Sequence, residues 1–88
     1  MATTINKTLG AISYEKIVDS AENFFLSIPK DGTQIEVICS DSVPLDSIDG
    51  HQIRGRDIES LSRTVFESGN IYARSLCSGP AKIILTTW

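Results

Sequence analysis

The stretch SYEKIVDSAENFFLSI, residues 13–28, decides the fold class that the sequence predicts. Its apolar side chains recur at three- and four-residue spacing, which is typical of one face of an amphipathic helix. They are Ile17, Val18, Ala21, Phe24, Phe25 and Ile28. Ser13 is a suitable N-cap, Glu15 lies in the first turn, and Pro29 ends the pattern. We therefore expect a helix over residues 13–28.

A second helical pattern, RDIESLSRTVFES, covers residues 56–68. The side chains expected to face the core are Ile58, Leu61, Val65 and Phe66, and those expected in solvent are Glu59, Ser62, Arg63 and Glu67. Gly69 and Asn70 then act as a C-terminal stop, because glycine tolerates left-handed backbone. The alternative is one continuous helix that runs on to Leu76.

Other segments have the two-residue alternation of β-strands. The clearest is TQIEVICS, residues 33–40, in which one face carries apolar side chains and the other, apart from Ile38, carries polar ones. The apolar face has Ile35, Val37 and Cys39, and the polar face has Gln34, Glu36 and Ser40. HQIR, residues 51–54, is a short edge strand. NIYARSL, residues 70–76, and KIILTTW, residues 82–88, are expected to pair as a hairpin, and a short N-terminal strand completes the sheet.

These elements predict a single α+β domain over residues 1–88. Both amphipathic helices would cover one face of a mainly antiparallel sheet of about three to five strands, which gives a small two-layer sandwich. If Gly69 does not end the second helix, the same pattern gives a βαββαβ, ferredoxin-like order.

A sheet covered on one face should be polar on the other, but the expected second face is apolar. The side chains predicted there are Ile38, Tyr72, Arg74, Leu76, Ile84 and Trp88. A contiguous apolar surface of this kind marks an interface with another protein or with a second copy. The alternative is that the N-terminal segment, with Ile5, Leu9 and Ile12, folds over this face.

Composition excludes several classes of function. The 88 residues carry a net charge of -3, which disfavours nucleic acid as a partner, because phosphate binding needs a basic surface. A sheet-face nucleic-acid binder that stacks bases on Tyr72 and Trp88 beside Arg74 and Lys82 remains a disfavoured alternative. No apolar run is long enough for a membrane helix, and the first residues do not resemble a secretory signal, so we expect a cytoplasmic protein.

The segment from Gly50 to Asp57 mimics a phosphate-binding loop but places arginine and aspartate where lysine and a hydroxyl belong. A weaker prediction survives, in which His51, Arg54 and Arg56 hold a small anionic ligand or nucleotide. No catalytic residues, metal ligands or cofactors are predicted. The lone histidine and the two separated cysteines, Cys39 and Cys77, supply too few zinc ligands.

The sequence thus favours a non-enzymatic, acidic protein-binding module. Such a module would act as a regulator or inhibitor by occupying a partner surface, or would form a homo-oligomer. Tyr72, Ile84 and Trp88 are its predicted anchors, since aromatic side chains dominate binding hot spots.

Overall fold

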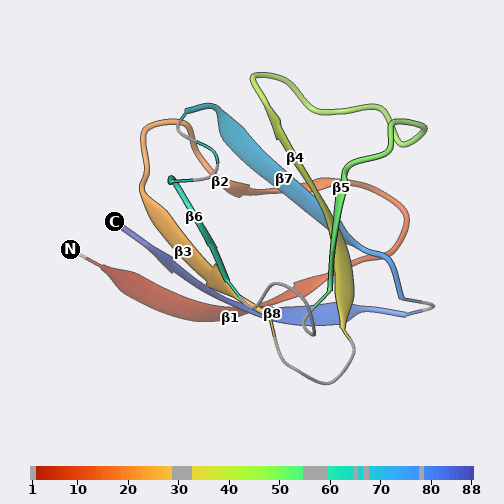
Figure 1. Cartoon of the computed structure of the whole chain (residues 1–88), viewed down its shortest axis with the longest axis horizontal. Coiled ribbons are helices and arrows are strands. Elements are labelled where there is room, and N and C mark those ends of the chain that lie inside the picture. Colours follow the sequence, from red (N-terminus) through yellow and green to blue (C-terminus); the bar gives the residue numbers. More distant parts are fainter. Residues whose placement is uncertain (1, 29–32, 55–59, 65, 67, 78) are drawn as a thin grey trace.

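A computed structural model describes residues 2–28, 33–54, 60–64, 66, 68–77 and 79–88, which form an antiparallel β-sandwich (Figure 1). Its strands are β1 (Thr3–Leu9), β2 (Glu15–Val18), β3 (Phe24–Ser27), β4 (Gln34–Ser40), β5 (His51–Arg54), β6 (Ser60–Ser62), β7 (Asn70–Ser75) and β8 (Ala81–Thr87). None of the described residues forms a helix of the length and apolarity that crossing a membrane requires.

The strands form two four-stranded sheets. Sheet A has the order β1-β8-β3-β6, and sheet B has the order β2-β7-β4-β5. Every pair of consecutive strands except β4 and β5 lies in opposite sheets, and the two orders together are those of an eight-stranded jelly roll. The first and last strands pair along their whole length, from Thr3 opposite Thr87 to Leu9 opposite Ala81, so both ends of the chain lie together (Figure 1).

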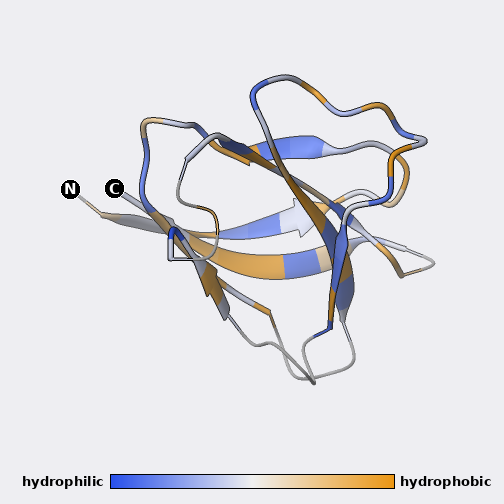
Figure 2. Cartoon of the chain, turned by 45° about the horizontal axis from the view of Figure 1, so that its top comes forward, coloured by the Kyte–Doolittle hydropathy of each residue, from blue (hydrophilic) through white to orange (hydrophobic). Residues whose placement is uncertain are grey.

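The core lies between the two sheets and follows the alternation of the strands. In β8, Ala81, Ile83 and Leu85 are buried, whereas Lys82 and Ile84 are exposed. Apolar stretches accordingly follow strands of both sheets in Figure 2. The largest fully buried apolar side chains come from both sheets and are Phe24, Leu9, Leu26, Ile35, Ile71, Ile83, Val18 and Val37.

The predicted α+β class is wrong, because the described part of the chain contains no helix. Residues 13–28 form β2 and β3 instead, joined by residues 19–23, where Ala21 is exposed and not in the core. A register shift between Lys16 and Val18 buries both Ile17 and Val18, and two adjacent buried residues imitate a helical stripe. After the turn, Phe24, Leu26 and Ile28 are buried with a period of two, while Phe25 is exposed.

The second predicted helix is also not formed where residues 56–68 are described. Ser60–Ser62 form β6, which buries Leu61 against β3. Arg63 is not solvated as expected: its guanidinium donates to the carbonyl oxygens of Asp19, Glu22, Phe66 and Gly69. It therefore ties the β2–β3 connection to the segment before β7. Ile58, Glu59, Val65 and Glu67, like Pro29 in the first prediction, lie outside the described residues.

The strand predictions are largely confirmed, but the predicted hairpin is wrong. Strands β4, β5, β7 and β8 match the segments expected, with β5 at a sheet edge, and the N-terminal strand exists as β1. However, β7 belongs to sheet B and β8 to sheet A, so they are not hairpin partners. Of the N-terminal segment, Thr3–Leu9 extends sheet A as a strand and does not lie over a sheet face, whereas Ile12 follows it in a loop that is tied to Arg74 on the outer side of sheet B.

An ion pair closes one side of the sandwich. Lys7 of β1 and Glu15 of β2 stand opposite the buried Ile83 and Ala73, so both point into the space between the sheets. Their Nζ and Oε2 atoms are 2.5 Å apart. This pair joins the edge strand of sheet A to the edge strand of sheet B.

Gly69 has the left-handed backbone expected of it, with φ of 97°, although it follows no helix. A Cβ atom there would lie 2.9 Å from the Cys39 sulfur. We expect Gly69→Ala to lower the free energy of unfolding by about 1–2 kcal/mol or more, from backbone strain and this contact. The check is urea unfolding followed by circular dichroism. Gly10→Ala, at a site with open space, should change stability little, and equal effects of the two substitutions would contradict the assignment.

Candidate interaction surfaces

The structure divides the predicted interface between two sheets. Tyr72 and Arg74 of β7 and Ile38 of β4 point to the outer side of sheet B, and Leu76 follows β7 as a half-buried residue. Ile84 of β8 points to the outer side of sheet A, and Trp88 continues the same alternation. The single apolar face assumed from the α+β fold is therefore two separate faces.

A buried polar cluster, which we call the clamp, lies on the outer side of sheet B. Arg74 and Glu36 are direct cross-strand partners, and Arg74 Nε lies 2.8 Å from Glu36 Oε1. The other Glu36 oxygen accepts from the Tyr14 hydroxyl at 3.4 Å and from the Gly50 amide at 2.9 Å. The Arg74 guanidinium also lies 4.1 Å from the centre of the Tyr14 ring. The clamp comprises Tyr14, Glu36 and Arg74.

The clamp fixes two loops that cross the outer side of sheet B. Arg74 Nη1 donates to the carbonyl oxygens of Ile12 at 3.0 Å and Asp46 at 2.8 Å, and Nη2 donates to that of Ile48 at 3.4 Å. The Tyr14 hydroxyl has one proton, which it donates mainly to the Ile48 carbonyl oxygen at 2.7 Å, so the 3.4 Å contact with Glu36 is the weaker arm of a shared hydrogen bond. Residues 41–50 are thus joined to residues 10–14, although both segments lack regular structure.

Gly50 is required where the loop returns to the sheet. A Cβ atom on Gly50 would lie 2.9 Å from both Ile38 Cγ1 and the Val37 carbonyl oxygen, and 3.1 Å from the Tyr14 hydroxyl. Any larger residue would push the loop away from Glu36. The glycine therefore allows the close approach that the amide-to-carboxylate hydrogen bond needs.

The clamp determines the charge state of Glu36. Burial by itself would raise the Glu36 pKa, but the hydrogen bonds from Arg74, Gly50 and Tyr14 and the charge of Arg74 outweigh it and hold the pKa below its usual value. Burial and the neighbouring Glu36 charge raise the pKa of Tyr14, so its hydroxyl stays a donor. Glu36 is consequently an anion with a buried, fully paired carboxylate.

The clamped loops display large apolar side chains to solvent. We call this the loop surface and define it as Ile12, Val43, Leu45 and Ile48. Ile12 is 78% exposed, Val43 and Leu45 are each 69% exposed, and Ile48 is 46% exposed. Apolar residues along the β4–β5 loop are visible in Figure 2.

The outer side of sheet A carries a second apolar surface, which we call the sheet A face. Phe25 stands opposite Thr86, and Ile84 is offset from it by two residues on the neighbouring strand. Trp88 lies on the other diagonal, since its backbone amide and carbonyl pair with Asn23. Diagonal neighbours of this kind are within reach of aromatic side chains. Phe25, Ile84 and Trp88 are 46%, 43% and 52% exposed and together form one patch centred on Phe25.

The rest of the sheet A face is rich in hydroxyl groups and poor in charge. The described residues that share it with the apolar patch are Thr4, Asn6, Thr8, Asn23, Ser27, Ser60, Ser62, Lys82 and Thr86. Lys82 is the only charged residue among these described positions, although the chain has 11 acidic and 8 basic residues. The Thr4 and Thr86 hydroxyl groups pair with each other at 2.7 Å.

The residues predicted to bind an anion are not brought together where the structure describes them. His51 stands opposite Val37 and Arg54 opposite Gln34, so their side chains lie on opposite sides of β5. Arg56 lies outside the described residues. His51 instead lies 6.0 Å from the ring centre of Phe66.

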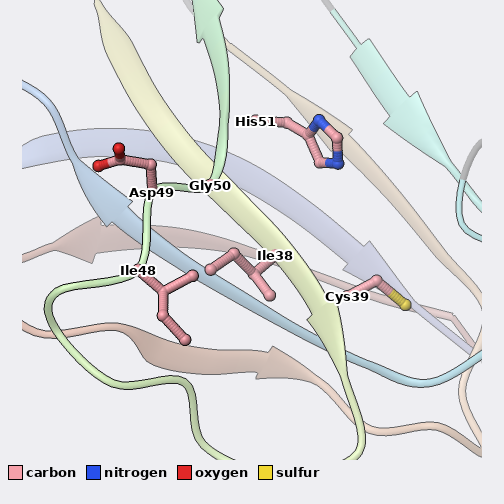
Figure 3. Close-up of a pocket in the computed structure, with 6 residues that line it drawn as sticks. All are labelled: Ile38, Cys39, Ile48, Asp49, Gly50 and His51. Atoms are coloured by element: carbon pink, nitrogen blue, oxygen red, sulfur yellow. The ribbon is translucent and has the colours of Figure 1, made fainter.

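An open pocket of about 240 Å³ lies beside His51, lined by Ile38, Cys39, Ile48, Asp49, Gly50 and His51. Figure 3 shows Ile38, Ile48 and Asp49 on one side of the β4 ribbon and Cys39 and His51 on the other. The polar groups of this pocket do not converge on one point, and the Asp49 carboxylate would repel an anion. The Cys39 thiol donates to the Ser68 carbonyl oxygen. No group of three or more potential metal ligands lies in the described ranges.

Sequence reasoning missed the most informative residues, Phe25 and the clamp. The helical pattern predicts Phe25 in the core, although Phe24, Leu26 and Ile28 already alternate around it. The alternation of residues 33–40 predicts Glu36 on a polar strand face, but its partner Arg74 is distant in sequence. Only the β4–β7 register brings the two together.

A comparison with known protein families, curated proteins and solved structures finds no match to the chain.

Removal of the Glu36 charge should change both stability and its pH dependence. Because the folded-state pKa is depressed, Glu36 stabilises the fold above its ordinary value of 4.5, and that contribution is lost as pH falls through the folded pKa. We expect Glu36→Gln to lower the unfolding free energy by about 2–3 kcal/mol at neutral pH. Its acid-range loss of stability should also be shallower than that of the wild type. Urea unfolding across the acid range measures both, and an unchanged slope would contradict the clamp.

Proposed function

We propose that the chain is a non-catalytic protein-interaction module that associates with a second copy of itself through the sheet A face. The observation that carries this is the composition of that face: three exposed large apolar side chains, many hydroxyl groups and no acidic residue among its described positions. Depletion of charge with retention of aromatic residues is the compositional mark of an interface core.

The charge distribution favours a second copy as the occupant. The chain carries a net charge of -3, so two copies repel each other unless they meet where carboxylates are absent. In the described part of the chain, the sheet A face is such a place. Its paired hydroxyl groups and apolar patch are also self-complementary, as a two-fold interface requires.

The alternative functions have less support. A nucleic-acid surface built on Tyr72 and Arg74 is disfavoured because Tyr72 is only 4% exposed and the Arg74 guanidinium is committed to Glu36 and three carbonyl oxygens. An anion site is disfavoured by the separation of His51 from Arg54. We further propose a reducing, cytoplasmic setting, which the free thiols of Cys39 and Cys77 support.

Sedimentation velocity over a range of protein concentrations tests self-association. The wild type should form a dimer as concentration rises, and Ile84→Thr combined with Trp88→Ser should weaken dimerisation by about tenfold or more, because aromatic anchors dominate such interfaces. Both side chains are exposed, so the substitutions should leave the monomer folded.

The matched control is Val43→Ser with Leu45→Ser, which removes a comparable amount of exposed apolar surface from the loop surface. This control should dimerise like the wild type. A wild type that stays monomeric throughout, or sheet A variants that dimerise normally, would rule out the proposed function.

A further inference from the structure

The loop surface is a separate feature from the sheet A face, and its parts are held next to each other. One guanidinium, that of Arg74, binds the carbonyl oxygens of Ile12, Asp46 and Ile48. The Ile48 amide also donates to the Leu45 carbonyl oxygen at 3.1 Å, which closes a turn. Three of the four apolar side chains therefore project from one small, connected region of backbone.

The backbone of these loops is anchored while their side chains stay in water. An ion pair as buried as Glu36–Arg74 has a desolvation cost, which hydrogen bonds to the surrounding groups must offset. Here those groups are the loop carbonyls and the Gly50 amide. A loop whose conformation is fixed in advance loses less entropy when it binds, which raises affinity for a matching surface. A fixed loop backbone with exposed apolar side chains thus favours binding to another molecule.

We infer that the loop surface docks into an apolar groove on a different protein, and that basic side chains line the rim of that groove. The apolar residues Val43, Leu45 and Ile48 are interleaved with exposed Asp41, Asp46 and Asp49, and residues 41–50 contain no lysine or arginine. The cation of the clamp, Arg74, is already paired with the Glu36 carboxylate. Residues 41–50 therefore present apolar side chains interleaved with negative charge.

The same charges argue against other occupants. A second copy would bring the aspartates of both loops together, and like charges placed face to face oppose binding. The anionic surface of a membrane would be repelled for the same reason. A basic-rimmed groove instead gains from each aspartate and accepts the apolar side chains. This inference goes beyond the proposed self-association and uses a different face of the molecule.

A display library of random peptides, selected on the immobilised full chain, supplies the probe. Peptides that combine large apolar residues with lysine or arginine should be enriched. Synthetic versions of the enriched peptides should bind the Val43→Ser/Leu45→Ser variant about tenfold more weakly than the wild type, as measured by calorimetry. Raised salt should weaken their binding to the wild type, because the rim contacts are between exposed charges.

Two further variants make the test specific. Ile84→Thr/Trp88→Ser should bind the peptides like the wild type, since it alters only the sheet A face. Tyr14→Phe keeps every apolar side chain of the loop surface but removes the hydroxyl that holds Ile48, so it should bind more weakly although it remains folded by circular dichroism.

The inference is overturned if no peptide is enriched, if the enriched peptides are acidic or wholly apolar, or if they bind the loop variant as well as the wild type. It is also overturned if phosphatidylcholine vesicles bind the wild type and not the loop variant, because the occupant would then be a lipid surface. Sedimentation is independent of these readouts, so failure of either proposal leaves the other testable.

Discussion

The buried contact between Glu36 and Arg74 joins the two central strands of sheet B and also fixes both loops on its outer side. Its carboxylate and guanidinium are each satisfied by neighbouring groups, which is the condition under which a buried ion pair is tolerated. Exchange of such a pair for apolar residues is often neutral or stabilising in proteins, so we infer that this pair contributes conformational specificity. In this chain the specificity concerns the β4–β7 register and the path of residues 41–50.

The sequence predicted strands better than it predicted how the chain connects them. Residues 33–40, for example, place apolar Ile35, Val37 and Cys39 at every second position on the core side of β4, a pattern that a window of a few residues can detect. The segment 13–28 misled because its register shift and its turn put apolar residues at helical spacing. In a jelly roll almost every connection changes sheets, so the contacts that distinguish strand from helix are formed by residues far apart in sequence. Local patterns carry little of that information.

The candidate surfaces could be predicted only in part for the same reason. Ile84 and Trp88 were expected to be exposed and are. Tyr72, which has the same alternation, is buried because sheet B is covered on its outer side. The cover consists of loops, and nothing in the composition of residues 41–50 reveals that an arginine distant in the chain will hold them down. Conversely, the absence of acidic residues from the described positions of the sheet A face becomes visible only when the order β1-β8-β3 is known.

The ion pair between Lys7 and Glu15 has a consequence for how copies of this protein can assemble. Strand β1 is a free edge of seven residues with no proline, and such an edge invites strand addition from copy to copy. An inward-pointing charge on an edge strand is one of the devices that block this, because a stacked neighbour would bury the lysine away from water. Lys7 therefore disfavours contact at the β1 edge, whereas the dimer that we propose uses the sheet A face. Two copies that meet through the same face would form a closed dimer, whereas strand addition at an edge would continue from copy to copy into a filament.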